Sequence, residues 1–180
     1  MQSYDYAHRQ GVEEISWAAF GELAAVLAER LAAAGIDTVV GIARAGLFPA
    51  TAVACMLQCE LYPVRITRRV NDQVTFQHPI WKVDVTPEVA GRKVAVVDEI
   101  SDSGETLRLV AERVQERGAA RVVTACLISH SWAAPAPAVT ARITDALVVF
   151  PWDKRVYREG QWRIHPELEA ALRLQSEWRE

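Results

Sequence analysis

Acidic and small hydroxyl residues gather in one short run of the sequence, VAVVDEISDSGETL at residues 94–107. Asp98 and Glu99 are adjacent and follow four apolar residues directly, and Asp102 comes three positions after Glu99. Adjacent carboxylates at the end of a buried strand are unfavourable unless they meet a cation or sugar hydroxyls. The spacing therefore predicts a site for Mg²⁺ or for a hydroxylated ligand.

The second half of this run, Asp102 to Thr106, is typical of a turn that opens a helix. Backbone amides at a helix start, with the hydroxyls of Ser103 and Thr106, can bind an anion, and Gly104 lets a phosphate approach the backbone. A sugar phosphate with vicinal hydroxyls fits that layout. The alternative is an ordinary acidic turn in which Asp102 or Ser103 caps the helix.

Strands and helices alternate along the chain around this run. Apolar runs predict strands, and amphipathic patterns predict helices. The alternation predicts an α/β fold, a mostly parallel twisted sheet flanked by helices, in a single domain spanning residues 1–180. In such sheets ligands bind at the carboxyl ends of the strands, where the strand order reverses. The predicted strands are 37–42, 60–67, 93–97, 121–128 and 146–150, and the predicted helices are 16–34, 47–58, 105–117 and 166–178.

Composition limits the classes of function. The 180 residues are 51% hydrophobic and carry a formal net charge of -3, so no basic face for nucleic acid is indicated. No run approaches the ~18 apolar residues of a membrane span. We interpret Cys55, Cys59 and Cys126 as buried free thiols rather than metal ligands. Together these features predict a cytoplasmic protein that binds neither nucleic acid nor membrane.

Two further segments carry recognisable patterns, GIARAGLFPA at 41–50 and VVFPWD at 148–153. With the run at 94–107, and in the same order, they resemble motifs of the type I phosphoribosyltransferases. The first resembles the pyrophosphate loop of that family, usually written Arg-Gly-Gly, with Ala45 in place of the first glycine. That loop often holds a non-proline cis peptide. The second resembles the Pro-Trp-acid segment of the xanthine, guanine and hypoxanthine enzymes.

The resemblance implies the type I fold with a small hood region and an Mg²⁺-dependent reaction. The substrates would be 5-phosphoribosyl 1-pyrophosphate (PRPP) and a purine base, and the products a nucleoside 5′-monophosphate and pyrophosphate, as in purine salvage. It also implies a homodimer or homotetramer. Two alternatives remain: transfer to a different base, and a PRPP-binding regulatory protein.

The resemblance also implies roles for individual residues. Asp102 would be the catalytic acid/base, and Asp98, Glu99 and Asp153 would serve the metal. The residues around the ribose and its 5′-phosphate would be Asp98, Glu99, Ser101, Asp102, Ser103, Gly104, Glu105 and Thr106. The residues around the pyrophosphate would be Arg44, Ala45, Gly46, Arg68 and Arg69. Residues 68–89, which are polar and without periodicity, would form a flexible loop over the site and carry His78 and Trp81.

The base-binding residues would be His130, Leu147, Val148 and Trp152. Purine enzymes of this family tend to carry a lysine after the strand that ends near residue 128, and His130 falls nearest that position. It could donate a hydrogen bond to the 6-oxo group of the base. Alternatively the substrate is not a 6-oxopurine, or His130 is a surface residue. Trp152 could close the base pocket or pack beneath it.

Overall fold

A computed structural model describes residues 11–70, 73–77 and 79–177, and the chain divides into two compact units. The terminal unit combines the N-terminal residues through Phe20 with Asp145 and the residues after it. The central unit runs from Gly21 to Thr144. In the described part of the chain, no helix is both long enough and apolar enough to cross a membrane.

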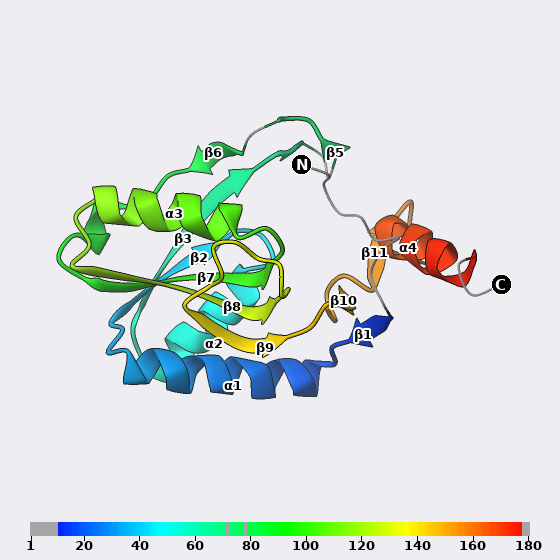
Figure 1. Cartoon of the computed structure of the whole chain (residues 1–180). Coiled ribbons are helices and arrows are strands. Elements are labelled where there is room, and N and C mark those ends of the chain that lie inside the picture. Colours follow the sequence, from blue (N-terminus) through cyan, green and yellow to red (C-terminus); the bar gives the residue numbers. More distant parts are fainter. Residues whose placement is uncertain (1–10, 71–72, 78, 178–180) are drawn as a thin grey trace. The chain divides into compact units, whose positions relative to one another are not determined.

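A six-stranded sheet forms the middle of the central unit (Figure 1). Neighbouring strands are parallel except at one edge, where β6 pairs antiparallel with β3. The order runs outward from β2 in both directions, so it reverses between β2 and β7. In spatial order the strands are β6 (Ile80–Val83), β3 (Glu60–Thr67), β2 (Thr38–Ile42), β7 (Lys93–Ser101), β8 (Arg121–Ser129) and β9 (Val139–Ile143).

Helices cover both faces of this sheet (Figure 1). Helix α3 (Glu105–Glu116) contacts β7 and β8 on one face, and α2 (Leu47–Leu57) contacts β2 and β7 on the other. Helix α1 (Trp17–Ala33) lies on the same side as α2. The predicted architecture, a mostly parallel sheet flanked by helices, is confirmed.

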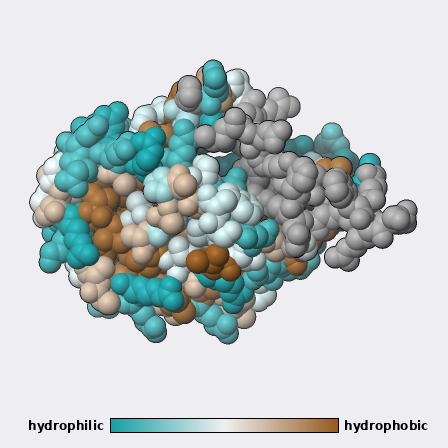
Figure 2. All heavy atoms as spheres, viewed as in Figure 1, coloured by the Kyte–Doolittle hydropathy of each residue, from teal (hydrophilic) through white to brown (hydrophobic). Residues whose placement is uncertain are grey.

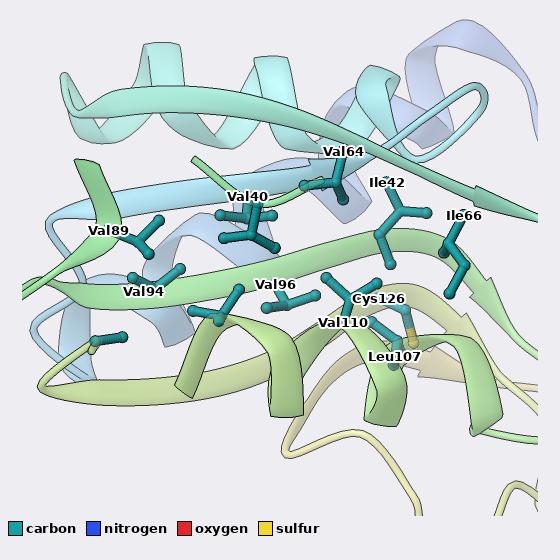
Figure 3. Close-up of a cluster of buried hydrophobic side chains, with 13 residues drawn as sticks. Val40, Ile42, Val64, Ile66, Val89, Val94, Val96, Leu107, Val110 and Cys126 are labelled. Carbon is teal, nitrogen blue, oxygen red and sulfur yellow. The ribbon is translucent and has the colours of Figure 1, made fainter. Parts of the chain in front are cut away.

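Valine is the commonest residue in the core between the sheet and α3 (Figure 3). Val40 of β2 and Val96 of β7 pair in register, and Val110 of α3 is fully buried in the same cluster. All residues of β2 are buried, as expected for a parallel strand covered on both faces. Each such side chain contributes about 1.5–3 kcal/mol by burial, which holds the strand ends in a fixed position.

Two differences from the predicted elements bear on function. Strand β7 runs to Ser101 rather than ending at residue 97, because Ile100 and Ser101 continue the ladder with Ile128 and Ser129 of β8. Residues 68–89 contain β4 (Arg69–Val70), β5 (Gln73–Val74), β6 and a 3₁₀ turn at Pro87–Val89. The edge strands β6 and β9 are short and have no fully buried residue, and each is interrupted by polar side chains, so their sequences give no long apolar run. The flexibility of 68–89 stays a prediction.

In the terminal unit, β1 (Val12–Glu14) pairs in parallel with β10 (Leu147–Val149), and β11 (Arg155–Arg158) forms a hairpin with β12 (Gln161–Ile164). The predicted C-terminal helix is α4 (Pro166–Glu177). The Trp152 ring stacks on Phe150 at 4.8 Å and contacts the rings of Trp17 and Phe20. Trp152 therefore packs within an aromatic cluster of this unit.

The exposed face of α3 carries oppositely charged pairs. Arg108 pairs with Glu112, and Arg113 with Glu116 and Asp84. On the face of the molecule in Figure 2, small hydrophobic areas alternate with hydrophilic ones. Exposed pairs of this kind contribute roughly 0–1 kcal/mol each, so the apolar core rather than surface charge stabilises α3 on the sheet.

The three cysteines differ in burial, and all are free thiols. Cys126 is buried, as predicted, whereas Cys55 is exposed, which corrects the prediction for that residue. Burial in the core raises the pKa of the Cys126 thiol to about 12. Cys59 is partly buried, and burial together with the nearby charges of Asp37 and Glu60 raises the pKa of its thiol.

A thiol-specific disulfide reagent is therefore expected to modify Cys55 quickly in the folded protein and Cys126 only after unfolding, because the thiolate is the reactive form. Release of the coloured thiol at mildly alkaline pH, with and without denaturant, measures this. Cys55→Ser should remove the fast phase. Fast modification of Cys126 in a folded variant lacking Cys55 and Cys59 would contradict the burial described here.

Candidate active site

Two loops meet where the strand order reverses. Residues 43–46, here called the Arg44 loop, follow β2, and residues 98–104, here called the acidic segment, end β7 and lead into α3. A Cβ atom added to Gly46 would lie 2.5 Å from Asp98 Oδ1 and 2.5 Å from the Ile42 carbonyl oxygen. Only a residue without a side chain fits there. The structure thus brings Gly46 into contact with Asp98, which is distant in sequence.

The Arg44 loop is a tight turn fixed by backbone hydrogen bonds. The peptide bond between Ala43 and Arg44 is cis, so the non-proline cis peptide expected from the resemblance is present in a loop that carries Ala45. The Ala43 amide donates to the Val64 carbonyl of β3 at 2.7 Å, and the Phe48 amide donates to the Ala45 carbonyl at 3.0 Å. The Arg44 side chain is exposed, and α2 begins at Leu47.

The Asp98 carboxyl group has an unusual electrostatic environment. It is surrounded by protein atoms although part of the residue remains accessible, and this desolvation raises its pKa well above the ordinary value. The neighbouring Glu99 carboxyl raises the pKa of Asp98 further, by charge repulsion and by a hydrogen bond between the two groups. The Glu99 amide donates a hydrogen bond to Asp98 Oδ1 at 3.0 Å, and this bond lowers the pKa of Asp98. A cation or hydroxyl donors would relieve this environment.

The turn after β7 packs against the segment that follows β8. Gly104 has a positive φ of 82° and caps α3, and the Glu105 amide donates to Ser103 Oγ at 3.3 Å. A Cβ atom on Gly104 would lie 2.3 Å from the Pro135 carbonyl oxygen. Ser101 Oγ is buried and has no hydrogen-bond partner among the described residues. A buried hydroxyl without a partner indicates a place for water or a ligand.

His130 and Trp132 lie beside this turn. His130 is only 2% exposed, so the alternative of a surface histidine is wrong. Its Nδ1 lies 2.6 Å from the Thr144 carbonyl oxygen and donates to it. The Trp132 ring stacks on the His130 ring at 4.5 Å and 13°, and Trp132 Nε1 donates to Asp102 Oδ1 at 3.1 Å. Sequence reasoning missed Trp132; its position after β8, whose carboxyl end adjoins that of β7, could have indicated it.

The remaining predicted residues lie in several places. Arg68 follows β3 and is half-buried, and Arg69 lies in β4. His130 belongs to the central unit, whereas the other predicted base-binding residues and Asp153 belong to the terminal unit. His78 lies outside the described residues. Across residues 11–70, 73–77 and 79–177, no group of three or more histidines, cysteines and acids could hold a metal by itself.

The sequence model of the phosphoribosyl transferase domain matches residues 12–158, which is most of the chain. This chain belongs to the phosphoribosyl transferase family. This match confirms the resemblance drawn from the sequence motifs. It also confirms the prediction that the chain is an enzyme of the glycosyltransferase type.

Individual members of the phosphoribosyl transferase family support the assignment. A xanthine-guanine phosphoribosyltransferase of Nitratidesulfovibrio vulgaris is 31% identical over 150 residues, covering 79% of this chain and 85% of that protein. The crystal structure of a purine phosphoribosyltransferase from Pyrococcus horikoshii Ot3 aligns with a TM-score of 0.71 and 27% identity, over 82% of this chain and 98% of that one. A Helicobacter pylori xanthine-guanine-hypoxanthine phosphoribosyltransferase shares the fold, with a TM-score of 0.66, 17% identity, and coverage of 81% and 93%.

Proposed function

We propose that this enzyme transfers the 5-phosphoribosyl group from PRPP to a purine base of the hypoxanthine, guanine or xanthine type, in purine salvage. The contact between Gly46 of the Arg44 loop and Asp98 of the acidic segment carries the proposal. It joins a turn suited to pyrophosphate with carboxylates suited to ribose hydroxyls. The substrates named for the 31% identical relative and for the Pyrococcus structure support the choice of purine.

Each part of PRPP has a matching group in the central unit. The start of α3, with Ser103, Gly104, Glu105 and Thr106, binds the 5′-phosphate through amides and hydroxyls. Asp98 and Glu99 accept hydrogen bonds from the ribose hydroxyls, and Ser101 Oγ provides a further buried polar group. Arg44, Ala45, Gly46, Arg68 and Arg69 bind the pyrophosphate. Such contacts align the anomeric carbon and stabilise the positive charge that develops there as pyrophosphate leaves.

Asp102 is the acid/base in this proposal. It lies between the residues for the ribose and those for the 5′-phosphate, in the turn that leads to α3. The purine loses its imidazole proton as its nitrogen attacks the anomeric carbon, and a carboxylate at this position can accept that proton. In the central unit, His130 is the proposed contact for the base. Leu147, Val148 and Trp152 of the terminal unit remain candidates from the sequence, Leu147 for an apolar contact and Val148 for backbone contacts.

Mg²⁺ fits the donors at this site. Asp98 and Glu99 are hard oxygen ligands, and the raised pKa of Asp98 is what a carboxyl without its cation would show. Two adjacent carboxylates do not complete a coordination shell, so substrate oxygens and water would supply the rest. Asp153, in the terminal unit, remains a candidate from the sequence alone. When bound, Mg²⁺ neutralises charge on the departing pyrophosphate.

The enzyme is proposed to act in the cytoplasm as a homodimer or homotetramer. The free thiols of Cys55, Cys59 and Cys126 support a reducing compartment. Exposed apolar side chains such as Ile143, which is 68% exposed, are available for contacts between subunits.

The test is to incubate the protein with PRPP, Mg²⁺ and one base at a time, from hypoxanthine, guanine, xanthine, adenine, uracil and orotate, and to follow pyrophosphate release. We expect release with a 6-oxopurine and formation of the corresponding 5′-monophosphate. Asp102→Asn should lower the rate by about 100-fold or more, the usual scale for general acid/base catalysis. Glu116→Gln, a change at an exposed residue of α3, serves as the control.

Pyrophosphate release with only adenine, uracil or orotate would show that the substrate is a different base and not a 6-oxopurine. No release with any base, together with saturable PRPP binding by calorimetry, would overturn the catalytic proposal and favour a PRPP-binding regulatory protein.

A further inference from the structure

Trp132 donates a hydrogen bond from its indole Nε1 to the Asp102 carboxylate, with 3.1 Å between Nε1 and Oδ1. Asp102 is the acid/base of the proposed function, and the inference rests on that function. We propose that Trp132 is a positioning residue that fixes the orientation of the Asp102 carboxylate toward the base. It acts through Asp102 rather than by contacting the substrate.

The Trp132 ring packs against the buried His130 ring. It stacks on His130 at 4.5 Å between ring centroids, with 13° between the ring planes. His130 is itself 2% exposed, and its Nδ1 is held by the Thr144 carbonyl oxygen at 2.6 Å. A stacked ring on a buried, hydrogen-bonded ring has few orientations available. The indole N–H therefore points in a fixed direction.

Backbone hydrogen bonds join the segment around Asp102 to the segment around Trp132 on both sides of this contact. The His130 amide donates to the Ser101 carbonyl, and the Ala134 amide donates to the Ser103 carbonyl, both at 3.1 Å. Ser101 and Ser103 are the neighbours of Asp102, and His130 and Ala134 lie two residues to either side of Trp132. These bonds fix the register between the segments, so Nε1 and Oδ1 meet without further adjustment.

The exposure of Trp132 argues against a purely structural role. The residue is 49% exposed, so it contributes much less to the core than a buried tryptophan would. A carboxylate on a turn can rotate about its side-chain torsions, and a donor at one oxygen restricts that rotation. A charge-assisted hydrogen bond of this kind is stronger than a neutral one. It is also directed at the group that must meet the purine proton.

The test is Trp132→Phe, which keeps an aromatic ring on His130 and removes only the donor. We expect kcat to fall by about tenfold to 100-fold while the KM for PRPP stays close to the wild-type value. In the Asp102→Asn background the same change should have little further effect on the residual single-turnover rate, because the two groups act as a unit. Trp162→Phe, at an exposed tryptophan of β12, is the matched control.

An unchanged kcat in Trp132→Phe would overturn the proposal. So would an equal fold loss in the wild-type and Asp102→Asn backgrounds, because that would place the effect elsewhere. If Trp132→Phe fails to fold, Trp132→Tyr provides a second variant that keeps a stacking ring and moves the donor away from Nε1. Circular dichroism and thermal melts identify such a failure.

A nuclear magnetic resonance measurement separates this inference from the proposed function. The protein has six tryptophans, and ¹⁵N labelling gives one indole N–H signal for each. The signal absent from Trp132→Phe is that of Trp132, and Asp102→Asn is expected to shift it more than the other five. An unshifted signal would overturn the positioning contact. Absence of pyrophosphate release in the wild type, with the signal shifted, would instead overturn the proposed function.

Discussion

Replacing Asp98 with asparagine is expected to stabilise the ligand-free protein at neutral pH and to abolish phosphoribosyl transfer. Burial and the adjacent Glu99 carboxyl raise the pKa of Asp98, so the ionised form is disfavoured in the folded state. An asparagine side chain has nearly the same shape and carries no charge, and its oxygen can still accept the hydrogen bond from the Glu99 amide. We expect the free energy of unfolding to rise on the order of 1 kcal/mol, which corresponds to about 2–4 °C in Tm for a chain of this size.

The direction of the pH dependence follows from the raised pKa. Between the unfolded-state pKa of Asp98 and its higher folded-state pKa, the folded protein holds the proton that the unfolded chain has released. The free energy of unfolding contributed by Asp98 therefore falls as pH rises through this window. Thermal melts across mildly acidic to neutral pH should show this fall in the wild type and a smaller one in Asp98→Asn.

Asp84 offers a control of the opposite sign. Asp84 is exposed, and the slight desolvation that it undergoes tends to raise its pKa, but the Val85 amide and the guanidinium groups of Arg117 and Arg113 outweigh that effect and lower the pKa. Asp84→Asn should therefore lose stability at neutral pH rather than gain it. A lower Tm of Asp98→Asn than of the wild type at neutral pH would show that Asp98 is stabilising when ionised, contrary to the environment described here.

Replacing Gly46 with alanine is expected to lower kcat/KM for PRPP by about 100-fold or more, the scale associated with displacing a positioned group by about 1 Å. The added Cβ would lie 2.5 Å from both Asp98 Oδ1 and the Ile42 carbonyl oxygen. The second of these is backbone and cannot move aside as a flexible side chain can. The Arg44 loop and Asp98 must therefore separate.

Steady-state kinetics with varied PRPP and a thermal melt check this prediction. Gly21→Ala is the matched control, because a Cβ atom there meets nothing within 4 Å and the position lies inside α1. Alanine within a helix is favoured over glycine by about 0.5–1 kcal/mol, so this control should be active and slightly more stable. Full activity of Gly46→Ala would show that close contact between the Arg44 loop and Asp98 is not required.

Local patterns in the sequence determined the alternation of strands and helices and the place of the acids at a strand end. The run before Asp98 is apolar because a parallel strand such as β7 is covered on both faces, and that pattern is legible without a structure. The turn at Gly104 could also be predicted from the sequence, because serine, glycine and threonine at a helix start form a local motif. The family resemblance depended on these local motifs as well.

Contacts between distant segments were decided only by the tertiary structure. Strand β7 continues through Ser101 because β8 supplies hydrogen-bond partners, although the sequence there is polar. His130 is buried, and Trp132 reaches Asp102, because the register of β7 and β8 sets their loops side by side. The meeting of Gly46 with Asp98 depends likewise on β2 and β7 being neighbours. The residue types of a segment indicate what that segment can bind. Strand order and register decide which segments meet, and no short stretch of sequence encodes them.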